Sequence, residues 1–382
     1  MSSGTLRDRI GTTAFAFRGY NITNQGRSHE LLAVPAYEKT LQELLGEASQ
    51  LCAAAVKRPV DLVQRVREQH PTSLETFPED VAVIVAVELA QIRLLHDFFD
   101  IDYSRSKLAF GYSLGEMAAL AAAGVYRMQD VLTPLLAMSM ECAELARDVS
   151  MGVVFSRGPA LDRDAIGRLC VELNREGAGV IGISAYLSPN TVLLLGQRDT
   201  VERFKRRMHE VLPDEVHLRT NQYHWPPLHT PILWERNIPN RAAMMMHTIR
   251  RGLTAPLPPV LSLVTGKCSY NDYNSRDLLN RWIDEPQRLW DAIAESLVVG
   301  VDTYIHVGPE ANLIPATFKR LADNIEQQLA GRSFSSYGMR AAAGMAQRPW
   351  LAKVLSNRTA LLRAPYVEHI MLEDWLLENA PK

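Results

Sequence analysis

The sequence lacks several features that would place it in a broad class of proteins at once. Its 382 residues contain only four cysteines, Cys52, Cys142, Cys170 and Cys268, which lie far apart and match no metal-ligand spacing. They indicate free thiols in a reducing compartment and predict no metal site. The formal net charge is only -2, so no excess of one sign points to nucleic acid as a partner.

Long apolar runs are absent as well. The N-terminal stretch MSSGTLRDRIGTTAFAFRGY has no apolar core of signal-peptide length, and no run reaches the ~20 residues that a helix needs to cross a bilayer. We therefore expect a cytoplasmic protein with no membrane span. Hydrophobic residues make up 47% of the chain and charged residues 22%, a mixture typical of a globular protein with a sizeable core.

What the sequence does contain is an alternation of short apolar strands and helices. Outside the middle of the chain, we expect strands at 13–17, 107–110, 258–266 and 303–309, helices over 41–67, 81–99 and 313–330, and a broken helix over 278–297. Beyond about residue 331 the composition turns to Gly, Ser, Arg and Ala, which suggests a linker. The apolar residues of the C-terminal HIMLEDWLLE are expected to pack back onto the domain, although a synthase partner is an alternative.

The middle of the chain follows a different order. There we expect strands at 151–156, 179–187, 191–196 and 215–220 and helices over 163–175 and 200–211. Because Ser188, Pro189 and Asn190 form a good turn between the second and third strands, the order is β-α-β-β-α-β. This order predicts a ferredoxin-like unit of about 70 residues inserted into the rest of the chain.

The pentapeptide Gly111-Tyr112-Ser113-Leu114-Gly115 carries the strongest chemical signal. It follows a predicted strand and opens a predicted helix, which is the context that a Gly-x-Ser-x-Gly nucleophile turn requires. The backbone N–H of Leu114 would then face the same site as the Ser113 hydroxyl and serve an oxyanion hole. The bare pentapeptide also arises by chance, so the context carries the prediction.

A serine is a weak nucleophile and needs a base. Among the ten histidines, His229 stands out in YHWPPLHTPIL, because prolines stiffen the loop on both sides of it and a rigid loop can fix an imidazole. His224 and His306 are alternatives on sequence alone. For both we favour a structural role, because His224 ends a predicted strand and His306 lies inside one.

Four segments in order resemble the acyl-CoA:acyl-carrier-protein acyltransferase family, the malonyl-transacylase fold of fatty acid and polyketide synthesis. AFAFRGYN…GRSHELL (14–32) is similar to the family's FPGQGSQ…G.EL, and GYSLGEMAALAAAGV (111–125) to GHSLGEYAAL.AAGV. PPLHTPIL (226–233) resembles the segment with the catalytic histidine, and YIHVGPEANL (304–313) resembles..EVGP...L. The inserted unit also falls where the family has it, and the resemblance covers roughly residues 13–325.

The resemblance implies an α/β fold with an α/β-hydrolase-like core subdomain and an inserted ferredoxin-like subdomain. Residues 1–149 and 224–330 would form the large subdomain, 150–223 the small one, and 331–382 a C-terminal linker and extension. It also implies an acyl-enzyme route in which Ser113 is the nucleophile and His229 the general base and acid. The N–H groups of Leu114 and Tyr20 would be the oxyanion donors. The family usually has glutamine at the position of Tyr20, but a backbone donor survives a change of side chain.

One departure from the family concerns the acyl pocket. An arginine usually lies 25 residues after the serine, where it pairs with the free carboxylate of malonyl groups. In this sequence that position is Met138. Met138 is either ordinary helix core or the floor of a pocket for an uncharged acyl chain, and we favour the pocket, because a buried carboxylate without a partner would be very costly.

Two further departures lie beside the predicted pair. Tyr112 replaces the histidine that precedes the nucleophile, and Trp282 replaces a glutamine whose backbone carbonyl orients the catalytic imidazole in the family. Trp282 can still offer that carbonyl. We assign Tyr112, Met138 and Trp282 to the acyl pocket.

The expected function is therefore serine-dependent acyl transfer from coenzyme A, or another thioester, to the phosphopantetheine of an acyl carrier protein, with a non-malonyl acyl group. No permanently bound cofactor is expected. A ketosynthase or another synthase component is a further candidate partner. An acyl-thioester hydrolase and a non-catalytic docking scaffold remain alternatives. The basic clusters at 203–207 and 250–251 are expected to be solvated helix faces, although one of them is a candidate docking site for an acidic carrier protein.

Overall fold

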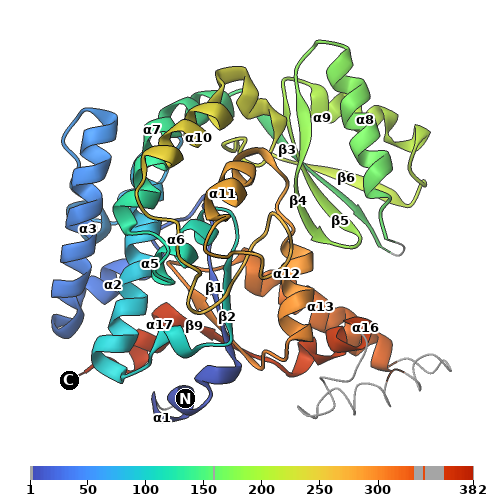
Figure 1. Cartoon of the computed structure of the whole chain (residues 1–382). Helices are drawn as coiled ribbons and strands as arrows, with labels where there is room; N and C mark the ends of the chain where they lie inside the picture. The colour runs from blue at the N-terminus through green and yellow to red at the C-terminus, as the bar shows by residue number, and fades with distance from the viewer. Residues whose placement is uncertain (1–2, 158–159, 331–338, 340–356, 382) are drawn as a thin grey trace.

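Two sheets organise the fold, seen as separate layers in Figure 1. The computed structural model describes residues 3–157, 160–330, 339 and 357–381. Within these residues, five strands form a parallel sheet in the order β7-β2-β1-β8-β9 and four strands form an antiparallel sheet in the order β4-β5-β3-β6. The parallel strands are β1 (Thr13–Phe17), β2 (Leu108–Gly111), β7 (Val260–Leu261), β8 (Thr303–Val307) and β9 (Glu368–Met371).

The parallel sheet is buried on both faces, as its continuous apolar strands predict. In β1 the side chains alternate, so that Phe15 and Phe17 enter one core cluster while Ala14 and Ala16 enter another. The phenylalanine face packs on helices of the N-terminal half: α2 (Ser28–Ala33), α3 (Pro35–Val56), α4 (Leu62–Arg67), α5 (Phe77–Phe99), α6 (Leu114–Ala122) and α7 (Met128–Ala146). The alanine face packs on α12 (Leu289–Val298) and α13 (Leu313–Ala330).

The antiparallel sheet has the ferredoxin-like strand order that the sequence predicts. Its elements are β3 (Val149–Ser156), α8 (Arg163–Arg175), β4 (Ile181–Ser188), β5 (Thr191–Gln197), α9 (Thr200–Arg207) and β6 (Val216–Asn221). Helices α8 and α9 cover one face, where their apolar residues join those of the strands in a separate core. From the other face, Leu187 and Leu193 pack against the large sheet's alanine side, so the two sheets meet at a partly apolar interface. The subdomain boundaries at 149/150 and 223/224 stay a prediction.

Short helical elements complete the described chain. They are α1 (Ser3–Asp8), η1 (Ile10–Thr12), η2 (Tyr103–Arg105), η3 (Met208–Glu210), η4 (Pro231–Arg236), α10 (Ile238–Thr248), α11 (Ser275–Asp284), α16 (Asn357–Ala360), η5 (Leu361–Tyr366) and α17 (Leu372–Glu378). None of the helices in the described part of the chain combines the length and apolarity that a bilayer crossing needs. The linker expected from residue 331 falls mostly outside the described residues.

Two expected elements differ from the structure. The helical region 41–67 is two helices. The first, α3, ends at Val56, because the next residue, Lys57, is left-handed with a φ of 58° and Pro59 follows. The Asp61 side chain then caps α4 by accepting the Gln64 N–H at 2.9 Å. The strand expected at 258–266 contains only Val260–Leu261. Prolines before it lack N–H donors, and the chain then turns, with Gly266 at φ 72°.

The C-terminal segment packs back onto the large sheet, as expected. Strand β9 pairs in parallel with β8, and α17 buries Trp375 and Leu376 in the core. In Figure 1 this segment lies among the N-terminal helices. The Tyr37 hydroxyl donates a hydrogen bond to the Leu376 carbonyl at 3.0 Å, which ties the two ends of the sequence together.

Candidate active site

Ser113 lies on the turn between β2 and α6 in a strained backbone conformation. Its φ is 53° and its ψ is -118°, a region that non-glycine residues rarely adopt. Such strain persists only where the surroundings enforce it, and it is typical of nucleophile turns that hold a serine at the carboxyl edge of a parallel sheet. In the first turn of α6, the Gly115 and Glu116 N–H groups donate to the Tyr112 and Ser113 carbonyls at 3.0 and 2.9 Å.

The two glycines of the pentapeptide have a steric reason. A Cβ at Gly111 would lie 2.1 Å from the carbonyl carbon of Gly115, and a Cβ at Gly115 would lie 2.4 Å from the carbonyl oxygens of Phe17 and Arg18. The strand, the helix and the end of β1 therefore approach more closely than any side chain allows. This packing fixes the position of Ser113.

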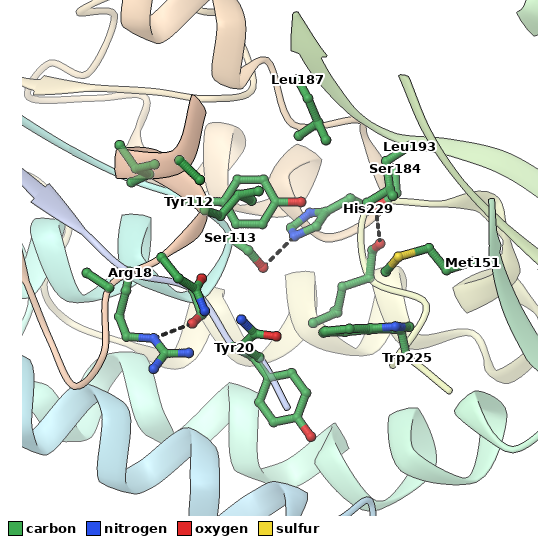
Figure 2. A pocket seen from close by; sticks show the side chains of 18 of the residues that line it. Arg18, Tyr20, Tyr112, Ser113, Met151, Ser184, Leu187, Leu193, Trp225 and His229 are labelled. Carbon is green, nitrogen blue, oxygen red and sulfur yellow. Dashed lines mark hydrogen bonds between the residues drawn. The ribbon is translucent and has the colours of Figure 1, made fainter. Parts of the chain in front are cut away.

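His229 faces Ser113 across this edge, as Figure 2 shows. The Ser113 Oγ and the His229 Nε2 are 2.7 Å apart. On the other side of the ring, Nδ1 lies 2.6 Å from the Trp282 carbonyl oxygen, and the His229 backbone N–H donates to the Ile283 carbonyl at 2.7 Å. Because a carbonyl can only accept, Nδ1 carries the proton and Nε2 is left to accept the Ser113 hydroxyl proton.

The imidazole of His229 is held neutral by burial. Its exposed fraction is 3%, and the Trp282 ring packs on it edge to face at a centroid distance of 4.9 Å. Burial lowers the pKa of His229 from 6.5 to about 4, although the hydrogen bond to the Trp282 carbonyl acts in the opposite direction. At neutral pH the ring is therefore in its neutral form, whose unprotonated Nε2 is what a general base requires.

Gln287 supports the serine turn, and the sequence analysis missed it. Its Oε1 accepts the Ser113 N–H at 3.2 Å, and its backbone N–H donates to the Ser184 carbonyl at 2.8 Å. The Trp282 Nε1–H adds a bond to the Ser113 carbonyl at 3.2 Å. Gln287 therefore connects the turn to β4 of the small subdomain. In the sequence, Gln287 is recognisable only as a polar residue between Pro286 and the apolar start of α12. That pattern alone is too weak to predict a site residue.

A cavity of about 440 Å³ lies over Ser113 and His229, between the two sheets. Figure 2 shows side chains that line it. The large subdomain contributes Arg18, Tyr20, Tyr112 and His306, and the small subdomain contributes Met151, Ser184, Leu187 and Leu193. Its volume and its mixed lining suit a small organic ligand. We call this space the entry cavity.

A second, smaller cavity of about 60 Å³ lies behind Ser113, and we call it the inner cavity. No charged side chain lines it. The lining includes Met117, Leu135, Met138, Cys142, Ala242, Met246, Leu279 and Trp282. Ser113 and Tyr20 line both cavities. Of the residues assigned to the acyl pocket from sequence, Met138 and Trp282 line the inner cavity, whereas Tyr112 lines only the entry cavity.

Tyr20 lies where the two cavities meet. Its ring packs edge to face on Phe77, at a centroid distance of 4.8 Å, and on Trp225 at 6.3 Å. The preceding Gly19 approaches the serine turn closely, since a Cβ there would lie 2.6 Å from the Tyr112 carbonyl oxygen. This contact holds the Tyr20 loop beside Ser113. The role of the Tyr20 and Leu114 N–H groups as oxyanion donors stays a prediction.

The other residues considered from sequence lie partly inside and partly outside the site. His224 lies outside both cavity linings and bonds through Nδ1 to the Val149 carbonyl at 3.0 Å. His306 lines the entry cavity, so it belongs to the site. In the basic cluster, Arg203 and Arg207 pair with Glu176 at 2.6 and 2.9 Å, which fits a solvated helix face. The described residues contain no group of three or more acidic, cysteine or histidine side chains placed to hold a metal ion.

Known proteins with similar sequences include a polyketide synthase and a transacylase. The polyketide synthase GfsA of Streptomyces halstedii is 24% identical over 315 residues, which are 79% of this chain and 4% of that protein. The malonyl-CoA-acyl carrier protein transacylase of Escherichia coli O157:H7 is 27% identical over 222 residues, covering 56% of this chain and 66% of the transacylase. The chain thus spans less than two thirds of the length of either relative. No protein-family model matches it.

The fold has close counterparts too. An acyl carrier protein S-malonyltransferase from Vibrio cholerae O1 superposes with a TM-score of 0.65 at 21% identity, over 80% of this chain and 93% of the other. At that identity the superposition shows a shared fold, with a parallel sheet and a ferredoxin-like subdomain. In sequence and in fold, the chain is similar to malonyl-CoA:acyl-carrier-protein transacylases and to the acyltransferase regions of polyketide synthases, the family that its motifs resemble.

Proposed function

We propose that this chain transfers an acyl group from coenzyme A, through an ester on Ser113, to the phosphopantetheine thiol of an acyl carrier protein. The observation that carries the proposal is the 2.7 Å contact between the Ser113 Oγ and the buried, neutral His229 Nε2 at the meeting point of two cavities. The relatives named for this reaction support the choice of substrates.

In the first half-reaction, His229 Nε2 takes the Oγ proton while Ser113 attacks the thioester carbonyl carbon. The oxyanion rests on the N–H groups of Leu114 and Tyr20. The carbon–sulfur bond then breaks, and His229 returns the proton to the departing thiolate. In the second half, His229 accepts the proton of the carrier thiol, sulfur attacks the acyl-Ser113 ester, and the proton passes to the Ser113 oxygen. Atoms and protons balance over the cycle.

The acyl group that fits best is short and uncharged. The inner cavity has space for roughly four to six water-sized groups, which suits a chain of a few carbons. Met138 lines it where the family places an arginine, and no cation lines it to pair with a carboxylate. A free carboxylate there would remain unpaired in an apolar space, at a cost of several kcal/mol.

Replacing Met138 with arginine tests this preference. We expect Met138→Arg to lower loading of Ser113 from acetyl- or butyryl-CoA and to raise the share loaded from malonyl-CoA by about tenfold or more, since a charge pair replaces an apolar contact. Intact-protein mass measured after incubation with each donor gives the result. Met140→Arg is the matched control, because Met140 lies on the same helix but is 46% exposed. Preferential malonyl loading of the unchanged chain would refute the uncharged acyl group.

The same preparation separates a transferase from a hydrolase. A transferase keeps its acyl-Ser113 ester in buffer and discharges it when holo carrier protein is added, whereas a hydrolase loses the ester at an equal rate in both conditions. We expect the ester to persist in buffer alone.

A further inference from the structure

A pair of histidines outside the proposed dyad lies against the entry cavity. His306 on β8 bonds through Nε2 to Nδ1 of His369 on β9 at 2.9 Å, and the two rings stack at a centroid distance of 5.2 Å. The His306 side chain is 1% exposed and lines the cavity. Beside it on β1 lies Ala16, which lines the same cavity.

The other ring nitrogen of His306 is a buried polar atom without a partner. Nδ1 is inaccessible to solvent and has no hydrogen-bond partner among the residues that the structure describes. Such an atom is costly, and most buried polar groups in folded proteins are paired. By contrast, the Arg18 guanidinium in the same cavity is engaged with the carbonyls of Gly19, Thr23 and Pro309. Nδ1 of His306 is thus an unsatisfied hydrogen-bonding position on a residue that lines the entry cavity.

The two cavities differ in the kind of ligand that they suit. The inner cavity is apolar and has no need of a polar ligand atom, whereas polar side chains, among them Asn312 and Ser184, line the entry cavity. A thioester bound at Ser113 extends an acyl chain on one side of its carbonyl and a pantetheine arm on the other. The acyl chain is apolar and the arm contains two amides, so the arm matches the entry cavity.

We propose that His306 binds an amide of the pantetheine arm through Nδ1, with His369 from the C-terminal segment fixing its ring from behind. This inference rests on the proposed function. Burial lowers the pKa of His306 and, to about 4, that of His369, so both rings are neutral at neutral pH. Each neutral imidazole carries one N–H. If His306 Nε2 donates to His369, then His306 Nδ1 is an acceptor, and if His306 Nε2 accepts from His369, then His306 Nδ1 is a donor. An amide offers both N–H and C=O and therefore pairs with either tautomer.

Replacing His306 with asparagine or with glutamine distinguishes binding of the pantetheine arm from a purely structural role. In His306→Asn the side-chain amide falls near the Nδ1 position, and in His306→Gln it falls near the Nε2 position. The proposal expects asparagine to preserve binding of the arm and glutamine to lose it. A purely structural role of the pair with His369 expects the reverse order.

The experiment measures kcat/KM for acylation of Ser113 by one acyl group carried on ethanethiol, N-acetylcysteamine or pantetheine, which contain no amide, one amide and two. The unchanged full chain should prefer the amide-bearing donors. His306→Gln should lower that preference about three- to tenfold, the usual effect of one neutral hydrogen bond, while its rate with the ethanethiol ester stays within about twofold. His306→Asn should keep most of the preference.

A loss that is equal for all three donors, or a His306→Gln preference equal to that of the unchanged chain, would overturn this inference while leaving acyl transfer intact. A chain that none of the donors nor acyl-CoA acylates would overturn the proposed function together with it. If His306→Gln does not fold, the unchanged chain labelled with ¹⁵N-histidine provides a second test. Free pantetheine should shift the His306 Nδ1 resonance, and the absence of a shift at saturating pantetheine would contradict the proposal.

Discussion

Ser113 and His229 are positioned mainly by backbone groups. The Trp282 carbonyl fixes the proton on Nδ1, and the Ile283 carbonyl holds the His229 main chain. A backbone acceptor is available whatever the side chain, which is why the change from the family's glutamine to Trp282 leaves the pair intact. The tryptophan also gives something that glutamine lacks, since its ring packs on the imidazole and its Nε1–H bonds the Ser113 carbonyl.

The buried state of His229 predicts an unusual pH dependence. Because burial lowers the pKa of His229 to about 4, its basic form is present at every pH above that value. Loading of Ser113 from acyl-CoA should therefore stay constant from neutral pH down to about 5 and decline only near 4, whereas an ordinary histidine would begin to fail near 6.5. Single-turnover loading measured across pH checks this.

Circular dichroism at each pH is the control for acid unfolding. An acidic limb centred near 6.5 in a chain that is still folded would show that His229 is solvated in solution and would contradict the buried geometry.

Residues that reach the site through space were the ones that the sequence could not reveal. Gln287 supports the serine turn from beside β4, and His306 on β8, which was named from sequence but expected to be structural, lines the entry cavity and contacts His369 on β9; neither contact follows from spacing along the chain. Ser113 and His229 could be predicted because a short turn motif and a proline-stiffened loop carry local signals. Tyr112 and Met138 stood out in the sequence as departures from the family's pattern, but that they line two different cavities could be seen only in the fold.

At the scale of single elements, close packing around the serine turn is the main determinant. The carboxyl ends of strands β1 and β2 lie so close to the start of α6 that Gly111 and Gly115 have no space for a Cβ. Elements with strong periodicity, such as α5 and α8, could be predicted from sequence within a few residues. Element ends that depend on the backbone conformation of one or two residues could not be predicted. Examples are the break between α3 and α4 at Lys57 and the short strand β7.

Gly115→Ala tests the packing of the turn. Its Cβ would lie 2.4 Å from two carbonyl oxygens, so the helix must shift, and we expect loading of Ser113 to fall about a hundredfold with a loss of stability of about 1–3 kcal/mol. Loading rates and urea unfolding measure the two effects.

Gly46→Ala is the matched control, because a Cβ at that position in α3 meets nothing within 4 Å. It should stabilise the chain by about 0.5–1 kcal/mol or leave it unchanged, with normal loading. Similar behaviour of the two variants would show that the turn tolerates a side chain and is not held by contact.

At the scale of the whole molecule, the C-terminal segment is part of the frame of the site. The Glu373 carboxylate accepts the N–H of Arg27 at 2.9 Å and that of Glu310 at 2.8 Å. These two loops adjoin the residues that line the entry cavity, including Asn21 and Asn312. One carboxylate near the end of the sequence therefore joins loops that lie more than 280 residues apart.

Glu373→Ala should destabilise the chain by about 1–3 kcal/mol, because it leaves two backbone N–H groups without a partner in a mostly buried position. We also expect a raised KM for acyl-CoA. Asp374→Ala is the control, since the adjacent Asp374 makes only a half-exposed ion pair with Arg27 and should contribute about 0–1 kcal/mol. Equal effects in urea unfolding would mean that the C-terminal helix does not support these loops through Glu373.

The measurement that tests the central proposal most directly is the intact mass of the full chain after incubation with a short, uncharged acyl-CoA, followed by peptide mapping. We predict a single added acyl group on Ser113, its transfer to holo carrier protein, and no added mass in Ser113→Ala. A chain that gains no mass from any acyl-CoA, or that gains it equally when Ser113 is alanine, would contradict the proposed acyl-serine route.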